Sequence, residues 1–269
     1  MIELSVRKAA IILIALLTLI VAACSPSETD DNKRLTVFAA ASMKNALDEL
    51  TTVYSQTSSV EVTLSYGATP ALARQIIENA PANIFISANR AWMDQVEQQG
   101  RLLSGSRFDL AAGRLVLINY GDPMVRIDLS NTTADPNDNA DTRIGRSRVA
   151  MGLVDAVPAG IYGKAALQSL GLWEQIGPNV VQMAHVRAAL RLVERGEVPF
   201  GIVYQSDAQA SAKVSVAATF DEKTHPPIRY AAAAVKGAKE SAALSFLTFL
   251  KQADSQDVLA RHGFSAVSE

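Results

Sequence analysis

The chain contains a single cysteine, Cys24, among its 269 residues. No disulfide can form within it, so packing alone must hold the folded chain together. Positive charge is not in excess either: 25 basic residues stand against 27 acidic ones, a formal net charge of −2. This balance argues against nucleic acid as a partner. It also implies that any bound anion is held by local geometry and not by a generally positive surface.

Long apolar runs are scarce, and the one at the start of the chain is too short to span a membrane comfortably. Arg7 and Lys8 precede the apolar residues 9–23, which end in the sequence VAAC at Cys24. Residues 1–23 are therefore interpreted as a signal peptide for export. The stretch resembles a bacterial lipoprotein signal, in which cleavage leaves the cysteine at the new N-terminus and Cys24 carries the lipid. A plain signal peptide with an incidental cysteine is the alternative.

The polar residues 24–34 then predict a flexible, lipidated tether that anchors the protein to a membrane. The expected location is the periplasm or the outer cell surface. Removing residues 1–23 takes away two basic residues and one acidic one, which changes the net charge from −2 to −3.

Signatures of catalysis are missing from the chain. It has no G-x-S-x-G, no H-E-x-x-H, no phosphate-loop G-K-[ST] and no G-x-G-x-x-G. The three histidines, His185, His225 and His262, do not have the spacing of a metal site. Exported α/β chains are commonly enzymes or solute receptors, so these absences favour a receptor that is not an enzyme and has no cofactor.

What the chain does have is an alternation of strand and helix signals. Strands are expected at short apolar or alternating runs: 35–39, 60–66, 84–87, 114–119, 148–153, 200–204, 214–219 and 228–235. Helical spacing between them predicts an α/β fold with mostly parallel sheets flanked by helices. Residues 130–146 form a polar loop and are the expected site of disorder or insertion.

Polar motifs stand where strands should lead into helices. Ser42 in AAASMKNA and Thr69 in GATPALARQ are each predicted to be a helix N-cap, with Pro70 as the first residue of the second helix. A helix start exposes unpaired N–H groups and the positive end of a dipole. Two converging starts therefore indicate an anion site.

Two further positions, Ala159 in VPAGIY and Tyr204 at the end of FGIVY, also follow strands. Ligands of parallel sheets bind at the carboxyl ends of the strands, so all four positions are expected at one site. Each also has an ordinary structural explanation, such as a helix cap or a core tyrosine. Arg187, Arg191 and Arg195, spaced by four residues, are expected to form a solvated helix face.

Longer motifs give the chain a resemblance to a known family. They are AAASMKNALDEL, TPALARQIIENAPANIFISANRAWMD, VPAGIYGKAALQSLGLW, VRAALRLVERGEVPFGIVYQSDA and the closing RHGF. Over nearly all of residues 35–264 they resemble the periplasmic molybdate-binding proteins, the receptors of molybdate ABC importers, which have the type II periplasmic-binding-protein fold.

The resemblance implies two lobes that close on one tetrahedral oxyanion, molybdate or tungstate, and a monomer that delivers it to an importer permease. It implies lobe boundaries at 35–113 plus 219–269 and at 114–218, with two crossover strands at the hinge. It implies that Ser42 and Thr69 donate from one lobe. From the other lobe it implies backbone N–H groups of Ala159 and Val186 and the phenol of Tyr204.

This chain departs from the family pattern at several positions, among them Pro70, which removes a possible donor. Thr69 stands where the family usually has a serine, and His185 where it often has an acidic residue. Three other functions stay open: a receptor for another oxyanion such as sulfate, a serine hydrolase that uses Ser42 with His185, and a surface lipoprotein that does not transport.

Overall fold

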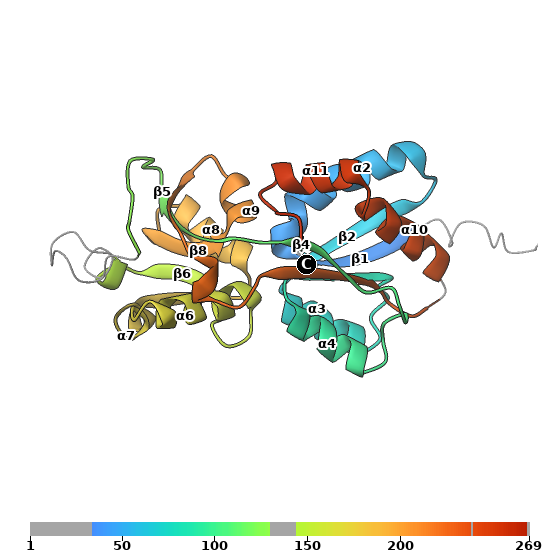
Figure 1. Cartoon of the computed structure of the whole chain (residues 1–269), viewed down its shortest axis with the longest axis horizontal. Coiled ribbons are helices and arrows are strands. Elements are labelled where there is room, and N and C mark those ends of the chain that lie inside the picture. The colour runs from blue at the N-terminus through green and yellow to red at the C-terminus, as the bar shows by residue number, and fades with distance from the viewer. Residues whose placement is uncertain (1–33, 130–143, 238, 268–269) are drawn as a thin grey trace, which may run out of the picture.

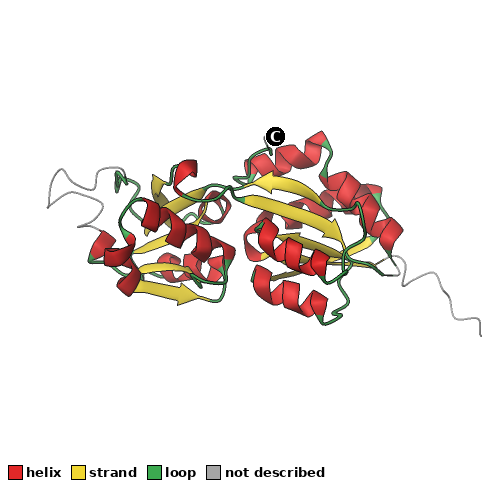
Figure 2. Ribbon diagram, turned by 60° about the horizontal axis from the view of Figure 1, so that its bottom comes forward, coloured by secondary structure: helices red, strands yellow, loops and turns green. Residues whose placement is uncertain are grey.

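The computed structural model of the chain describes residues 34–129, 144–237 and 239–267. The signal peptide, the tether with Cys24 and most of the predicted polar loop lie outside these residues. The described part forms two α/β lobes side by side along the long axis of the molecule (Figure 1), each with a five-stranded sheet between helices (Figure 2). No helix in the described ranges is long and apolar enough to cross a membrane.

The first sheet has the strand order β2-β1-β3-β10-β4. Its strands are β1 (Arg34–Ala40), β2 (Glu61–Gly67), β3 (Ile84–Ser87), β4 (Phe108–Ala112) and β10 (Arg229–Ala234). β1 runs parallel to β2 and β3, whereas β10 is antiparallel to β3 and β4. Helices cover both faces, so β1 is apolar on both sides: Val37 packs in one core and Phe38 in another.

The second sheet repeats this arrangement with the order β7-β6-β8-β5-β9. Its strands are β5 (Leu115–Tyr120), β6 (Val149–Gly152), β7 (Val180–Met183), β8 (Phe200–Tyr204) and β9 (Val214–Thr219). β5 is antiparallel to both of its neighbours. The expected two-lobe α/β fold is confirmed, and both sheets are mixed, each with one strand opposed to its neighbours.

Helices connect the parallel strands because such strands need a long crossover. In the first lobe the helices are η2 (Ala41–Met43), α2 (Lys44–Thr57), α3 (Thr69–Ile77), α4 (Arg90–Gln98), α10 (Glu240–Leu250) and α11 (Ala253–Arg261). In the second lobe they are α6 (Pro158–Ser169), α7 (Trp173–Ile176), η3 (Gly177–Asn179), α8 (Val186–Glu194) and α9 (Gln205–Gln209), and η4 (Glu222–Thr224) lies between β9 and β10.

Strand register brings distant residues to one edge of each sheet. Ala40, the last residue of β1, pairs with Gly67, the last residue of β2, and Ala39 pairs with Ile86 of β3. Ser42, Thr69 and Ala88 follow these strand ends and therefore lie together. In the second sheet, the parallel strands β6, β7 and β8 bring the starts of α6 and α8 and the end of β8 to one edge.

The chain passes between the two sheets twice. The first passage is Gly113–Arg114, between β4 and β5, and the second is residues 220–228, between β9 and β10. The two passages touch, because the N–H of Gly113 donates to the carbonyl of Ile228 at 3.1 Å.

Several local predictions were wrong. Ser42 is not an N-cap, since a 3₁₀ turn follows β1 and α2 begins at Lys44 without a side-chain cap. α3 begins at Thr69, one residue earlier than predicted, and Ala68 is the N-cap. Strands β4 and β7 were not predicted, because Asp109 and Gln182 interrupt the apolar runs FDLAA and VVQM and leave no clear alternation. Asn89 is the N-cap of α4, and its side chain accepts from the N–H of Trp92.

Gly160, the third residue of α6, packs closely against the backbone at the end of β6, and substituting it tests this packing. A Cβ there would overlap the carbonyl oxygens of Gly152 and Leu153, which are backbone atoms and cannot swing away. Alanine is the better helix former by about 1 kcal/mol, but overpacking costs about 1–3 kcal/mol and should win. We expect Gly160→Ala to lower the urea midpoint. Gly237→Ala, which meets no atom within 4 Å, is the control, and equal midpoints in both variants would contradict the packing argument.

Candidate functional site

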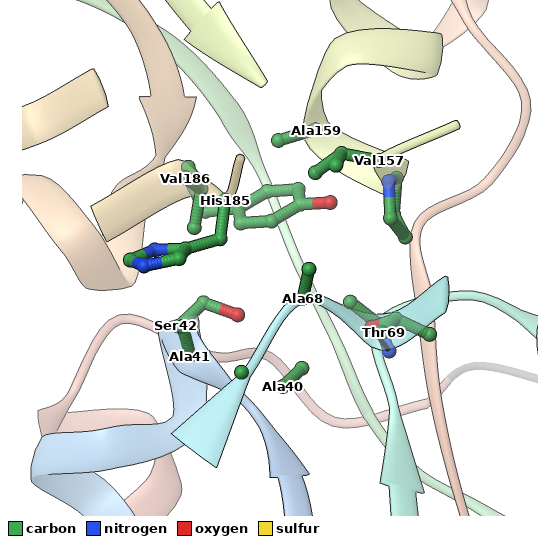
Figure 3. A pocket seen from close by; sticks show the side chains of 13 residues that line it. Ala40, Ala41, Ser42, Ala68, Thr69, Val157, Ala159, His185 and Val186 are labelled. Atoms are coloured by element: carbon green, nitrogen blue, oxygen red, sulfur yellow. Dashed lines mark hydrogen bonds between the residues drawn. The ribbon is translucent and has the colours of Figure 1, made fainter. Parts of the chain in front are cut away.

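A pocket lies between the lobes at the carboxyl edges of the two sheets. All five residues predicted as site residues line it: Ser42 and Thr69 from the first lobe, and Ala159, Val186 and Tyr204 from the second. Figure 3 shows Ser42 and Thr69 on one side and Ala159, His185 and Val186 on the other. The structure thus brings together residues up to 162 positions apart (from 42 to 204).

The pocket is small and carries no formal charge. Its cavity volume is about 10 Å³, about the space that one water molecule needs. Apart from the hydroxyl residues and His185, the lining consists of alanine, glycine, valine and proline, with no Asp, Glu, Lys or Arg among the described residues. A site of this size suits one small ion.

Three helices point their starts at this pocket. Thr69 and Val186 are the first residues of α3 and α8, and Ala159 is the second residue of α6. Within the described chain, no acceptor bonds to the backbone N–H of any of these three residues. Unpaired N–H groups at a helix start carry partial positive charge and attract anions.

The two hydroxyl groups of the first lobe are buried, and each has a hydrogen-bond partner on the side away from the pocket. The exposed fraction of Ser42 and of Thr69 is 2% in each case. Thr69 Oγ1 accepts a hydrogen bond from the N–H of Ala88 at 3.2 Å. Ser42 Oγ lies 2.8 Å from the phenol oxygen of Tyr230. Thr69 Oγ1, which acts as acceptor toward Ala88, keeps its own proton for a ligand.

Tyr204 supplies a third hydroxyl group from the second lobe. Its side chain is 1% exposed, and its phenol oxygen is buried without a hydrogen-bond partner among the described residues. Burial, and then the neighbouring Tyr230, Tyr162 and Asp207, raise the pKa of Tyr204 well above its ordinary value. The group therefore stays a protonated donor, and a buried donor without a partner is costly until a ligand accepts from it.

The charged groups nearest the pocket form a buried ion pair with each other. Arg187 Nε lies 2.5 Å from Asp207 Oδ1, and the side chains are 14% and 0% exposed. Burial raises the pKa of Asp207 to about 6, opposed by the charge of Arg187 and by the N–H of Tyr204, so the carboxyl group is mainly ionised at neutral pH. The prediction that Arg187 lies on a solvated face was wrong, because a partner 20 positions away buries it.

Two hydrogen bonds join the lobes beside the pocket. Arg187 Nη2 donates to the carbonyl of Ser42 at 3.4 Å, and Trp92 Nε1 donates to the carbonyl of Ala156 at 3.1 Å. Neither was expected from the sequence, since nothing local in the chain indicates contacts between residues 145 and 64 positions apart.

His185 precedes Val186 and serves as the N-cap of α8. Its Nδ1 accepts from the N–H of Ala188 at 3.2 Å, so this nitrogen carries no proton and the ring is neutral in this state. Burial, and then the charges of Arg191 and Arg187, lower the pKa of His185. The sequence signal for this role was its position directly before a helix start.

The geometry does not support the serine hydrolase alternative. In the described ranges, no hydrogen bond joins Ser42 to His185, and no carboxylate orients the His185 ring. Nor do the described residues include a group of three or more His, Cys, Asp or Glu side chains that could hold a metal ion. The arrangement is suited to binding an anion through donors.

Two α/β lobes that meet at a small donor-lined pocket define a solute receptor of the two-lobe binding-protein class. Residues 35–265 match the family described as bacterial extracellular solute-binding protein, and the chain belongs to that family. It is 38% identical to the molybdate-binding protein ModA of Escherichia coli K12, over 87% of this chain and 90% of that protein.

Two further relatives extend this comparison. A Bacillus subtilis protein, YvgL, provisionally named an ABC transporter substrate-binding lipoprotein, is 33% identical over 95% of this chain and 97% of its own. The solved periplasmic molybdate-binding protein of Azotobacter vinelandii superposes with a TM-score of 0.74 at 23% identity, covering 87% of this chain and all of that one (100%). The resemblance drawn from the sequence motifs is confirmed, as is the expectation of a receptor and not an enzyme.

The cap at His185 makes stability depend on pH in a defined direction. A pKa below the ordinary 6.5 means that folding favours the neutral ring, so this stabilisation is complete above pH 6.5 and is lost as the pH falls towards the folded-state pKa. We expect the melting temperature to fall more between about pH 7.5 and pH 5.5 in the wild type than in His185→Asn, whose amide caps the helix at both pH values. If the melting temperature falls by the same amount in both proteins, the capping role is excluded.

Proposed function

We propose that this protein is the extracytoplasmic receptor that delivers molybdate to an ABC importer, and that Ser42, Thr69, Ala159, Val186 and Tyr204 bind the anion. One observation supports this most strongly: uncharged donors from three helix starts and three hydroxyl groups converge on a pocket without a charged side chain. The relatives named molybdate-binding protein give the same substrate.

Uncharged donors can compensate the charge of this ligand. Molybdate is a dianion without a proton at neutral pH, and burying it would be costly if its oxygens found no donors. Each hydrogen bond to a charged group contributes about 1.5–3 kcal/mol, so several together offset a large loss of hydration. The helix dipoles add partial positive charge at the same point.

Selectivity follows from what the pocket lacks. With no carboxylate in its lining, it has no strong acceptor for the proton of a protonated oxyanion such as hydrogen phosphate. Sulfate is unprotonated but smaller than molybdate, so a shell sized for molybdate would leave its hydrogen bonds stretched. Tungstate has nearly the size of molybdate and should bind similarly. Sulfate is the alternative ligand.

Binding would close the lobes around the two passages of the chain. We assign residues 35–113 and 220–269 to the first lobe and 114–219 to the second, with the hinge at Gly113–Arg114 and in residues 220–228. The second boundary lies one residue later than the family resemblance implies, because Thr219 ends β9 of the second sheet. Each passage is short and lies between strands of different sheets, which is the usual place for a hinge. The closed form would then present both lobes to the importer permease.

We propose that Cys24 carries a lipid and that residues 24–34 tether a monomeric receptor to the membrane surface, in the periplasm or on the outer face of the cell. The sequence VAAC and the likeness to a Bacillus subtilis protein named as a lipoprotein support this proposal. Mass spectrometry of the protein from membranes tests it. An unmodified Cys24, or a cleavage site elsewhere, would contradict it.

Calorimetry of the chain from residue 25 onwards tests the ligand. We expect molybdate and tungstate to bind tightly, and sulfate and phosphate weakly or not at all. At a ligand concentration of about 100 times the dissociation constant, molybdate should stabilise the fold by about 2.7 kcal/mol. A melting shift with sulfate and none with molybdate would reassign the substrate.

Tyr204→Phe separates binding from folding. The phenol oxygen has no partner in the described structure, so its loss should leave the stability of the unliganded protein unchanged or slightly higher, while molybdate binding weakens by about 1–3 kcal/mol. Tyr54→Phe, in α2 and outside the pocket lining, is the matched control. Unchanged affinity in Tyr204→Phe would place the ligand elsewhere.

A further inference from the structure

Tyr230 is a fully buried residue (0% exposed) that the pocket lining does not include. It lies on β10, immediately after the second passage between the lobes. Its phenol oxygen is 2.8 Å from Ser42 Oγ, and its ring meets the ring of Tyr204 edge-on with centroids 5.8 Å apart. It thus contacts one ligand-facing residue from each lobe.

The direction of the bond between Tyr230 and Ser42 follows from counting protons. If Ser42 donated, the proton of Tyr230 would have no acceptor among the described residues, because the phenol makes no other hydrogen bond. A buried donor left without an acceptor is unfavourable. If Tyr230 donates, its proton is satisfied, and the proton of Ser42 is free to point into the pocket. The second arrangement leaves no proton unpaired once an anion is bound.

The phenol remains a donor over the physiological range. Burial, and then the charge of Asp207, raise the pKa of Tyr230 well above its ordinary value. The neighbouring Thr69 has a corresponding arrangement, since the N–H of Ala88 donates to Thr69 Oγ1 from behind. Both hydroxyl groups of the first lobe therefore receive a hydrogen bond on the side away from the ligand.

We propose that Tyr230 is a positioning residue for the anion: by donating to Ser42 Oγ, it aims the Ser42 proton at the ligand and strengthens Ser42 as a donor. A hydroxyl group that accepts one hydrogen bond is polarised and donates a stronger one. The proposal rests on the proposed function, because it concerns how the same pocket binds its oxyanion.

A double-mutant cycle on the affinity for molybdate tests this role. Tyr230→Phe keeps the ring and its packing and should weaken binding about 3- to 10-fold, the net effect of one hydrogen bond. In a Ser42→Ala background the same change should have no effect, since the hydroxyl that it acts on is gone. Melting temperatures of the unliganded variants check that all four proteins are folded, and Tyr54→Phe is the control for removal of a tyrosine hydroxyl outside the site.

The outcomes separate the two proposals. If the wild type does not bind molybdate, the proposed function fails. If the wild type binds and the two effects simply multiply, or Tyr230→Phe has no effect, the positioning role is wrong. Neutron diffraction of the molybdate-loaded protein gives an independent reading: a deuteron of Tyr230 between the two oxygens supports the proposal, and a Ser42 deuteron pointing to Tyr230 overturns it.

Discussion

The unpaired N–H groups at the starts of α3, α6 and α8 are the constraint on which the rest of this structure depends. Burying such a group without an acceptor costs free energy, so each N–H must face either water or a ligand. Parallel strands place successive helix starts at one edge of a sheet. Joining two such edges gives a pocket that attracts anions through the backbone, and the hydroxyl groups of Ser42, Thr69 and Tyr204 add side-chain donors to it.

The buried ion pair of Arg187 and Asp207 is consistent with a pocket that binds anions without a charged side chain. It lies next to Tyr204 and Ser42, yet its two charges cancel, and neither residue lines the pocket. A free cation at this point would strengthen the binding of every anion, whatever its size. A neutral pair instead leaves discrimination to the number and direction of the donors. The pair also supports structure, since Asp207 accepts from the N–H of Tyr204 at 3.2 Å, and Arg187 reaches the carbonyl of Ser42.

Local chemistry made part of this site predictable. Gly100 and Gly171 have positive φ and follow helix ends, as glycine commonly does. Pro70 and Pro158 mark helix starts. Ser42 and Thr69 were assigned as caps because a hydroxyl group before a helix usually caps it. Their true partners, Tyr230 and the N–H of Ala88, are 188 and 19 residues away. No local pattern indicates such partners, nor the pairing of Arg187 with Asp207.

The contacts between the lobes limit how far the protein can favour closure by itself. Trp92 and Arg187 each donate one hydrogen bond across the cleft, both to backbone carbonyls, and the second is long at 3.4 Å. A neutral hydrogen bond contributes about 0.5–1.5 kcal/mol, and the length of the Arg187 bond weakens what its charge would add, so the two together bias the lobes only modestly. A receptor that must both take up and release its ligand needs such a weak bias, because strong contacts would keep the lobes shut without cargo. The deciding contribution then has to come from an anion that accepts from donors of both lobes at once.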